Sequence, residues 1–327
     1  MKQPLRDNIF TVGIIGLGQI GMGLDVEESE SKDIFKSHIK SFYSSGGFEL
    51  VFVLDKDKSK LQLAKERYKK IPSFYSDINE IEFYPEIIVL ACNENVNLDL
   101  FYELKDVPGV KYFFVEKPFR LRDKKDYRTY KSKIIINYIR KFNPFYISLK
   151  KCIKKNLYGD LKSIDIKYSK GLDNTAPHFV DLLYYLFGNQ IRFNDVILIN
   201  KPLIIDSESS ASFLIKDFIN VNSYVSFHAI HDLYVIELDF IFKNKRIRIE
   251  NYENEVRYYD IDKDVNFPEY LNFVETKKIV LNNKDYMSHV TSHLHQLCHG
   301  KIPNDFSIER DLDVVSAINN IKNKINE

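Results

Sequence analysis

A glycine motif near the start of the chain is the first segment whose residue types and spacing could do chemistry. Gly16-Leu17-Gly18-Gln19-Ile20-Gly21 matches G-x-G-x-x-G and directly follows the apolar run Val12–Ile15. In a strand–turn–helix unit the first glycine permits a tight turn, the second lets the backbone approach a pyrophosphate, and the third lets helix and strand pack closely. Free N–H groups at the start of the following helix would then bind the phosphates. The motif predicts a dinucleotide site, with an ordinary glycine turn as the alternative.

An acidic residue, Asp55, ends the next strand-like run, Phe48–Leu54. A carboxylate at this point can accept hydrogen bonds from the adenosine ribose, and its charge would repel a 2′-phosphate. We therefore expect NAD as the cofactor rather than NADP, although Lys56 and Lys58 supply positive charge nearby.

The spacing between the glycine motif and this acid is long. Gly21 and Asp55 are 34 residues apart, whereas a plain unit has about 20. We expect the extra length in Leu24–Asp33, which contains the acidic run Glu27-Glu28-Ser29-Glu30. This segment is predicted to be a solvated surface loop, with a lid near the cofactor as the alternative.

A lysine stands at the end of a further strand-like run. The segment Glu116-Lys117-Pro118 directly follows Tyr112–Val115. Ligands of open α/β sheets bind outside the carboxyl ends of the strands, so Lys117 could reach the nicotinamide end of a dinucleotide. Its cation would stabilise a developing alkoxide. A surface lysine is the alternative.

A histidine at the start of a predicted helix could act as acid or base. His178 follows Pro177, a residue favoured in the first helical turn, and Asn174 lies four residues before it. Asp181 is one turn further along the same face and could hold the imidazole. Histidine titrates near neutral pH and suits proton transfer, while a purely structural histidine is the alternative.

Short apolar runs alternate with amphipathic stretches over residues 1–120. The predicted strands are Ile9–Ile15, Phe48–Leu54, Glu86–Ala91 and Tyr112–Val115, and the predicted helices are Lys58–Lys70 and Asn95–Leu104. Alternating units of this kind argue for a parallel sheet with right-handed crossovers. The fold class is therefore α/β, beginning with a doubly wound Rossmann domain.

The remaining residues, 121–327, predict a second α/β domain. Its expected helices are Pro144–Asn156, His178–Phe187, Tyr286–His299 and Ser307–Asn323, and its expected strands are Lys133–Tyr138, Leu161–Tyr168, Ser223–Ile230, Tyr234–Phe242 and Arg246–Glu250. Consecutive strands with short turns indicate a large, mostly antiparallel open sheet. The last residues, about 300–327, are expected to pack back on the first domain.

Bulk properties exclude several classes of function. A chain of 327 residues is long enough for two domains, and its net charge of +1, from 47 basic and 46 acidic residues, gives no footprint for nucleic acid or an anionic membrane. Three scattered cysteines and the lack of a long apolar segment predict a cytoplasmic protein without disulfides. His295 and His299 stand four residues apart without the glutamate of a zincin motif, so no metal is expected.

The glycine motif, then Glu116-Lys117-Pro118, then the Asn174/His178/Asp181 helix ending in Leu186-Phe187-Gly188 resemble the glucose–fructose oxidoreductase/inositol dehydrogenase/rhizopine-catabolism (Gfo/Idh/MocA) family. Ile139-Arg140-Lys141-Phe142 is similar to the family's basic-aromatic stretch, and Lys301-Ile302-Pro303 before an acidic helix is also similar. The resemblance spans nearly the whole chain.

This resemblance implies an oxidoreductase that transfers hydride between NAD(P) and a carbon of a sugar, cyclitol or nucleotide sugar. The members that the chain resembles most suggest a sugar used for surface polysaccharides. The resemblance implies a homodimer or homotetramer formed through the second sheet. It assigns the acid/base role to His178 and places Lys117 at the reacting hydroxyl and the nicotinamide ribose. The other residues that it places at the cofactor or the substrate are Cys92, Asn93, Glu116, Arg140, Asn174 and Asp181.

Several positions depart from the family pattern. Asn174 stands where many members carry aspartate, Cys92-Asn93 replaces Thr-Pro, and Asn97 replaces a frequent histidine. Two other functions therefore remain open. One is a redox-neutral glycosidase or lyase that retains NAD, and the other is a non-catalytic dinucleotide-sensing protein.

Overall fold

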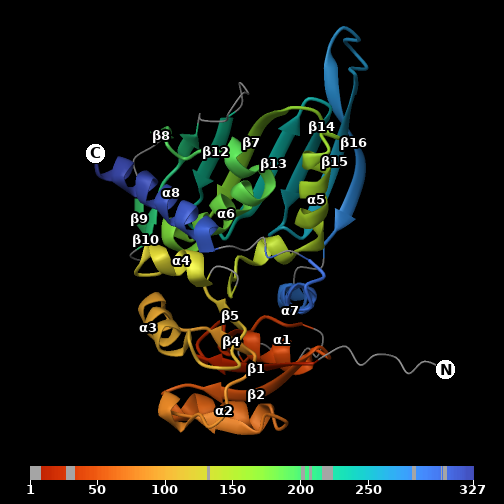
Figure 1. The fold of residues 1–327 in the computed structure, drawn as a ribbon. Helices are drawn as coiled ribbons and strands as arrows, with labels where there is room; N and C mark the ends of the chain where they lie inside the picture. Colours follow the sequence, from red (N-terminus) through yellow and green to blue (C-terminus); the bar gives the residue numbers. More distant parts are fainter. Residues whose placement is uncertain are drawn as a thin grey trace, which may run out of the picture. The chain divides into compact units, whose positions relative to one another are not determined.

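The computed structural model describes residues 9–26, 34–130, 133–199, 203–205, 208–215, 224–281, 285–302, 304 and 308–327. The acidic run Glu27-Glu28-Ser29-Glu30 and Pro303 lie outside the described residues. The chain forms two compact units, one of residues up to 143 with 284–312, and one of 144–283 with 313–327 (Figure 1).

The first unit is built on a six-stranded parallel sheet with the order β3-β2-β1-β4-β5-β6. Its strands are β1 (Phe10–Ile15), β2 (Phe48–Leu54), β3 (Ser73–Tyr75), β4 (Ile87–Leu90), β5 (Tyr112–Val115) and β6 (Ile134–Ile136). Its helices are α1 (His38–Ser44), α2 (Lys58–Arg67), α3 (Glu94–Leu104), α4 (Lys124–Tyr130) and α7 (Tyr286–Cys298), with 3₁₀ turns η1 (Gly23–Asp25), η2 (Ile78–Glu80) and η3 (Ile139–Phe142). The predicted Rossmann sheet is confirmed.

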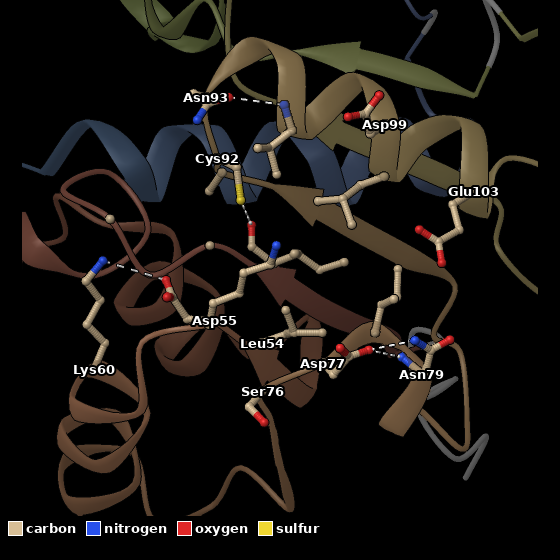
Figure 2. A pocket seen from close by; sticks show the side chains of 18 residues that line it. Leu54, Asp55, Lys60, Ser76, Asp77, Asn79, Cys92, Asn93, Asp99 and Glu103 are labelled. Atoms are coloured by element: carbon tan, nitrogen blue, oxygen red, sulfur yellow. Dashed lines mark hydrogen bonds and ion pairs between the residues drawn. The ribbon is translucent and has the colours of Figure 1, made fainter.

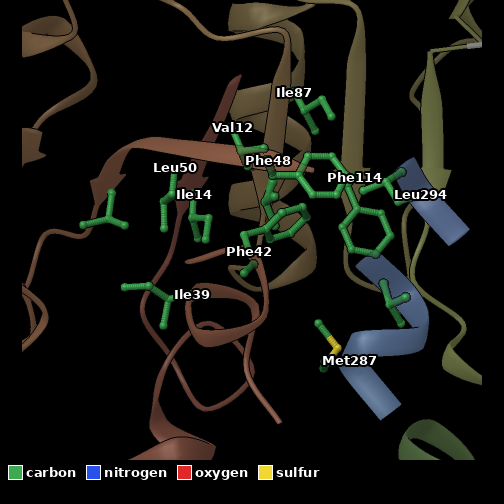
Figure 3. Close-up of a cluster of buried hydrophobic side chains, with 14 of the residues drawn as sticks. Val12, Ile14, Ile39, Phe42, Phe48, Leu50, Ile87, Phe114, Met287 and Leu294 are labelled. Atoms are coloured by element: carbon green, nitrogen blue, oxygen red, sulfur yellow. The ribbon is translucent and has the colours of Figure 1, made fainter. Parts of the chain in front are cut away.

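Apolar side chains on both sides of the strands hold this sheet in place. All four side chains of β4 are buried, as expected for a parallel strand covered on both faces. On one face, Val12 and Ile14 of β1 pack with Phe42 of α1 and Met287 of α7 in a single buried cluster (Figure 3). The hydroxyl of Ser41 donates to the Met287 carbonyl at 2.9 Å, which ties α1 to α7.

The second unit contains an eight-stranded sheet with the order β16-β15-β14-β13-β7-β12-β11-β8. The β7–β12 pair is parallel and the other pairs are antiparallel. Its strands are β7 (Leu161–Tyr168), β8 (Val196–Leu198), β11 (Phe213–Ile215), β12 (Tyr224–Ala229), β13 (Ile236–Phe242), β14 (Lys245–Glu250), β15 (Glu255–Lys263) and β16 (Leu271–Val280), beside a separate pair β9 (Leu203–Ile205) and β10 (Glu208–Ser210). The predicted large, mostly antiparallel sheet is confirmed.

Helices α5 (Pro144–Lys154) and α6 (Ala176–Phe187) lie against one face of this sheet (Figure 1). The burial of β13 alternates strictly, because one side chain in two faces the helices. A short turn, η5 (Gly188–Gln190), follows α6, and Gly188, with a φ of +59°, ends that helix as its sequence predicts. The long helix α8 (Ile308–Asn326) begins in the first unit and continues into the second.

Two boundaries differ from the sequence expectation. We expected the first domain to end near residue 120, whereas β6 adds a strand to the parallel sheet and the first unit runs to Asn143. We expected about 300–327 to pack back on the first domain, whereas α7 and the start of α8 belong to the first unit and the rest of α8 to the second.

Candidate functional site

A cavity of about 660 Å³ opens at the carboxyl ends of β1, β2 and β4 (Figure 2). The strand order reverses between β1 and β4, and this switch point is where open α/β sheets bind ligands. The cavity is lined by residues from these strand ends and from the segments that follow them, namely Ile15, Gly16, Gly18, Leu54, Asp55, Lys56, Lys60, Ser76, Asp77, Ile78, Asn79, Ala91, Cys92, Asn93, Val96, Asp99, Leu100 and Glu103. The structure thus brings together five of the predicted cofactor residues.

The three glycines of the motif meet different surroundings. A Cβ on Gly16 would lie 2.7 Å from the Cys92 sulfur, and one on Gly21 would lie 2.1 Å from the Gly16 carbonyl oxygen. A Cβ on Gly18 would meet no protein atom within 4 Å. Gly16 and Gly21 are therefore required by close packing, while Gly18 keeps a space open beside the cavity. This arrangement fits a pyrophosphate that approaches the backbone at Gly18.

The helix expected directly after the motif is not there, so that prediction is wrong. The motif is followed by hydrogen-bonded turns, including Met22 N–H to Gly18 O at 2.9 Å, and by η1. The first regular helix is α1, which begins at His38. We attribute this to extra residues between the motif and α1. They separate the glycine turn from the helix that would otherwise follow it directly.

The inserted residues interrupt the helix without displacing it. His38 N–H donates to Ile20 O at 2.9 Å and Ile39 N–H donates to Gly21 O at 3.0 Å. Residues 24 and 25 would make these two bonds in an uninterrupted helix. Removing the 14 residues 24–37 from the 34 that separate Gly21 and Asp55 leaves 20, the spacing of a plain unit.

Asp25 ties the two ends of the insertion together. Its carboxylate accepts from the backbone N–H of Ser37 at 2.7 Å and of Lys36 at 3.2 Å. Ser37 in turn is the N-cap of α1 and accepts from Lys40 N–H. The chain therefore leaves the glycine turn and returns to it at one point.

Asp55 stands in the cavity where a ribose would be recognised. One carboxylate oxygen accepts from Leu17 N–H at 2.6 Å and the other from Asp57 N–H at 2.9 Å, so the carboxylate is fixed beside the glycine turn. Each oxygen keeps a further lone pair for a ribose hydroxyl. Lys60 Nζ lies 3.8 Å from the carboxylate and brings a positive charge to the same end of the cavity.

Cys92 and Asn93 form the turn after β4. Burial, followed by the negative charge of Asp55, raises the pKa of the Cys92 thiol to about 11, so the thiol is neutral and a poor nucleophile. Asn93 caps α3 by accepting from Val96 N–H at 3.1 Å. Buried Asn97 accepts from Cys92 N–H and donates to Cys92 O, both at 3.0 Å, which explains an amide at this position.

Glu116 follows β5 and is held by two side chains that sequence reasoning missed. One of its oxygens lies 2.7 Å from His38 Nε2 and accepts from Asn137 Nδ2 at 2.7 Å. Both partners are 1% exposed. His38 gave no signal in the sequence because the insertion separates it from the glycine motif.

Lys117 is half-buried directly after Glu116, and the Lys117–Pro118 peptide is cis. Arg140, expected at the substrate, is buried in η3. Both residues belong to the first unit.

The second unit carries Asn174, His178 and Asp181. The expected loop before the helix is a π-helical turn, η4 (Gly171–Thr175), in which Ala176 N–H donates to Gly171 O. Asn174 is exposed on this turn, His178 is half-buried in the first turn of α6, and Asp181 is fully buried one turn later. Asp173 of the same π turn pairs with Lys322 of α8.

Metal-binding groups and membrane-spanning helices were also sought. Among the described residues, no group of three or more His, Cys, Asp or Glu side chains is arranged to hold a metal ion. His295 and His299 of the α7 region lie with their Nε2 atoms 3.1 Å apart and pack against Phe10. No helix within the described ranges has both the length and the apolar character needed to cross a bilayer.

Comparison with known proteins rests on structure, since no family model and no curated protein matches the sequence. Similar solved structures include a putative NADPH-dependent oxidoreductase from Desulfitobacterium hafniense, with a TM-score of 0.74, 12% identity and coverage of 98% of this chain and 96% of that one. The WlbA dehydrogenase from Bordetella pertussis, in complex with NADH and UDP-GlcNAcA, has a TM-score of 0.70, 14% identity and coverage of 99% and 97%. The chain has the same fold as these two solved structures.

The same fold occurs in a super-repressor mutant of Gal80p from Saccharomyces cerevisiae, which has a TM-score of 0.69, 15% identity and coverage of 97% and 96%. At these identities the likeness establishes the architecture of the chain. Its chemistry has to be argued from the residues of the site.

Proposed function

We propose that the protein is an NAD-dependent oxidoreductase that transfers hydride between the nicotinamide and a carbon of a sugar, cyclitol or nucleotide sugar. The observation that carries this proposal is the cavity at the β1/β4 switch point, where Gly18 leaves room for phosphates and Asp55 offers a fixed carboxylate. The dinucleotide, when bound, supplies the hydride acceptor or donor.

The preference for NAD rests on Asp55. Its charge opposes a 2′-phosphate, and its two hydrogen bonds to backbone N–H groups stop it from turning away. Lys60 weakens this preference because its ammonium group lies near the carboxylate.

Proton transfer and the stabilisation of charge are each assigned to one residue. His178, near the start of α6, would take the proton of the substrate hydroxyl in the oxidative direction. Lys117 would stabilise the developing alkoxide through its positive charge. Asn174, Arg140 and Asp181 are proposed as groups that orient the substrate, and Asn174 replaces the carboxylate that many relatives of this fold carry with a neutral amide.

Likeness supports the substrate class, and the open face of the large sheet supports the assembly. WlbA, which has the same fold, is solved with a nucleotide sugar, so sugar nucleotides for surface polysaccharides are the first compounds to screen. The face of the large sheet opposite α5 and α6 carries half-exposed charged side chains such as Glu237 and Asp239. We propose this face as the contact of a homodimer or homotetramer.

Gal80p supports a second candidate, a dinucleotide-sensing protein without catalysis, because a super-repressor mutant of it shares this fold. A redox-neutral, NAD-retaining glycosidase or lyase is a third. Net reduction of NAD by substrate distinguishes the oxidoreductase from both.

The first experiment is a thermal-shift titration of the purified protein with NAD and NADP, with Asp55→Ala as the variant. We expect NAD to stabilise the protein more than NADP, and the variant to bind NAD about tenfold to a hundredfold more weakly, since a charge-assisted hydrogen bond contributes about 1.5–3 kcal/mol. Asp99→Ala, another acid of the cavity wall, is the matched control. No shift with either nucleotide, and none found in the denatured supernatant, would rule out the dinucleotide site.

The second step screens nucleotide sugars for NAD reduction. On any substrate found, His178→Ala should cut turnover about a hundredfold or more while NAD affinity stays near that of the wild type. Unchanged turnover would remove His178 from the mechanism.

A further inference from the structure

Two buried networks of hydrogen bonds enclose the segment Glu116–Phe119, which carries Lys117. One network ends on Glu116, directly before the lysine, and the other ends on Phe119, two residues after it. The partners come from distant parts of the sequence, so the folded chain has to offset the entropy of closing long loops to bring them to this segment.

The network before Lys117 consists of His38, Asn137 and Glu116. His38 sits at the first position of α1, where its backbone N–H bonds to the Ile20 carbonyl of the glycine turn. Its ring packs edge-on against Phe114 of β5, with ring centroids 5.5 Å apart, and is 1% exposed. The imidazole therefore cannot turn away, and it holds the Glu116 carboxylate at 2.7 Å.

The network after Lys117 is centred on Asp311, in the first turn of α8. One oxygen of this buried carboxylate accepts from Phe119 N–H at 3.0 Å, and the other accepts from the Tyr138 hydroxyl at 2.6 Å. Asp311 is 1% exposed, and the Phe119 side chain is fully buried. A carboxylate that accepts two hydrogen bonds out of water holds its partners firmly.

We propose that His38 and Asp311 are positioning residues that fix the place of Lys117 by holding its neighbours on both sides. The inference rests on the proposed function, in which Lys117 stabilises charge on the substrate. It adds that the backbone on either side of the amine is held in place, through His38 at the glycine turn and through Asp311 of α8. Electrostatic stabilisation depends on such preorganisation, and a displacement of about 1 Å can cost a hundredfold in rate.

The two networks also share a link. Asn137, which donates to Glu116, is followed by Tyr138, which donates to Asp311. A single dipeptide after β6 therefore contacts both networks. Strand β6, which pairs with β5 in the parallel sheet, therefore places this dipeptide between the two networks.

The test measures the reactivity of the Lys117 amine directly. Wild type and variants are acetylated with limiting acetic anhydride, and the rate at Lys117 is read by peptide mass spectrometry relative to exposed Lys65 of α2. His38→Phe keeps an aromatic ring but removes the donor to Glu116, and Asp311→Leu removes the acceptor for Phe119. We expect each to change the Lys117 rate about threefold or more with Lys65 unchanged, because the amine no longer keeps one position.

Conservative variants separate positioning from general damage. His38→Gln keeps an N–H donor and Asp311→Asn keeps an acceptor, so both should return the Lys117 rate to within about twofold of wild type. If His38→Phe does not fold, Asn137→Leu removes the other donor to Glu116 and should give the same change. A folded His38→Phe or Asn137→Leu protein, together with a folded Asp311→Leu protein, that labels like wild type would overturn the proposal.

A parallel NADH titration of the wild type keeps the two hypotheses apart. Absence of NADH binding, with no dinucleotide released on denaturation, overturns the proposed function, while the labelling rates still decide whether Lys117 is held. On any substrate that the wild type turns over, His38→Phe should lower kcat about tenfold or more with KM within about twofold. A change in KM alone would contradict positioning of a group that acts in the transition state.

Discussion

The two sheets of the molecule offer their surroundings different surfaces. In the parallel sheet, every side chain of β4 is buried, so only the ends of the strands are open to a ligand. In the antiparallel sheet, β13 buries alternate residues, and two of the three others are acidic, of which Asp239 pairs with Arg246 at 3.0 Å. A sheet covered on both sides places its chemistry at strand ends, while a sheet covered on one side keeps a whole face for recognition.

The largest expected effect is on the free energy of unfolding, when two neighbouring residues of a strand in each sheet are replaced by asparagine. Ile88→Asn and Val89→Asn in β4 should both lower the free energy of unfolding by about 3–5 kcal/mol, because each buries an amide among apolar groups. In β13, Leu238→Asn should be comparably damaging, whereas Asp239→Asn should stay within about 1 kcal/mol. Urea denaturation followed by circular dichroism measures the four values.

Asp239→Asn serves as the internal control of this series, since it changes a charge without burying a new group. Measured on the dilute monomer, an equal cost for Asp239→Asn and Leu238→Asn would contradict an open side of β13. If the cost is equal only at concentrations where the chain assembles, this face is buried in the proposed homo-oligomer, and sedimentation of Asp239→Asn would show a loss of that assembly.

A smaller effect separates packing from ligand recognition at the glycine turn. Gly21→Ala should destabilise the first unit by about 3 kcal/mol, because its Cβ would overlap a backbone oxygen. Gly18→Ala should leave the melting temperature nearly unchanged but weaken NAD binding about tenfold, since its methyl group would occupy the phosphate space. Thermal shift with and without NAD gives both numbers. A Gly18→Ala protein that binds NAD normally would place the pyrophosphate elsewhere.

The smallest effect concerns pH. Burial raises the pKa of the Cys92 thiol from 9.0 to about 11. The folded protein therefore keeps this proton more tightly than the unfolded chain, so the stabilisation is complete below pH 9 and is lost as the pH rises toward 11. We expect about 2 kcal/mol less stability from this group at pH 11 than below pH 9. Cys92→Ser, whose hydroxyl does not titrate there, should show a shallower decline, and parallel curves would refute the assignment.

The sequence predicted those elements whose apolar pattern is strong. Strands β2, β5 and β7 were expected with the bounds that the structure gives them, because apolar runs mark β2 and β5 and a largely alternating apolar pattern marks β7. Strand β16 was not expected: eight of its ten residues are exposed, so packing leaves no period in the sequence. Its place is set by pairing with β15 along the backbone.

The site was predictable where one segment carries it and hidden where distant segments meet. The glycine motif was found from its spacing and Asp55 from its position at the end of a strand, and Gly16, Gly18 and Asp55 line one cavity. His38 and Asp311 were missed because each acts on a residue far away in the chain, and neither lies in a motif. The prediction of a regular helix directly after the motif was wrong. Nothing in the residue pattern shows that the helix starts only at His38 and then bonds to the carbonyls of the glycine turn.

The insertion at the glycine turn has a consequence for engineering. Asp25 meets Ser37, and the helix resumes against the carbonyls of Ile20 and Gly21, so the segment enters and leaves the fold at one closed junction. A junction of this kind tolerates changes of length, because only the closure entropy of the loop changes and the helix keeps its bonds. Residues 26–35 are therefore the place to graft a reporter peptide or a whole domain. A change in the graft would act on the hydrogen bond between Asp25 and Ser37, the residue directly before His38.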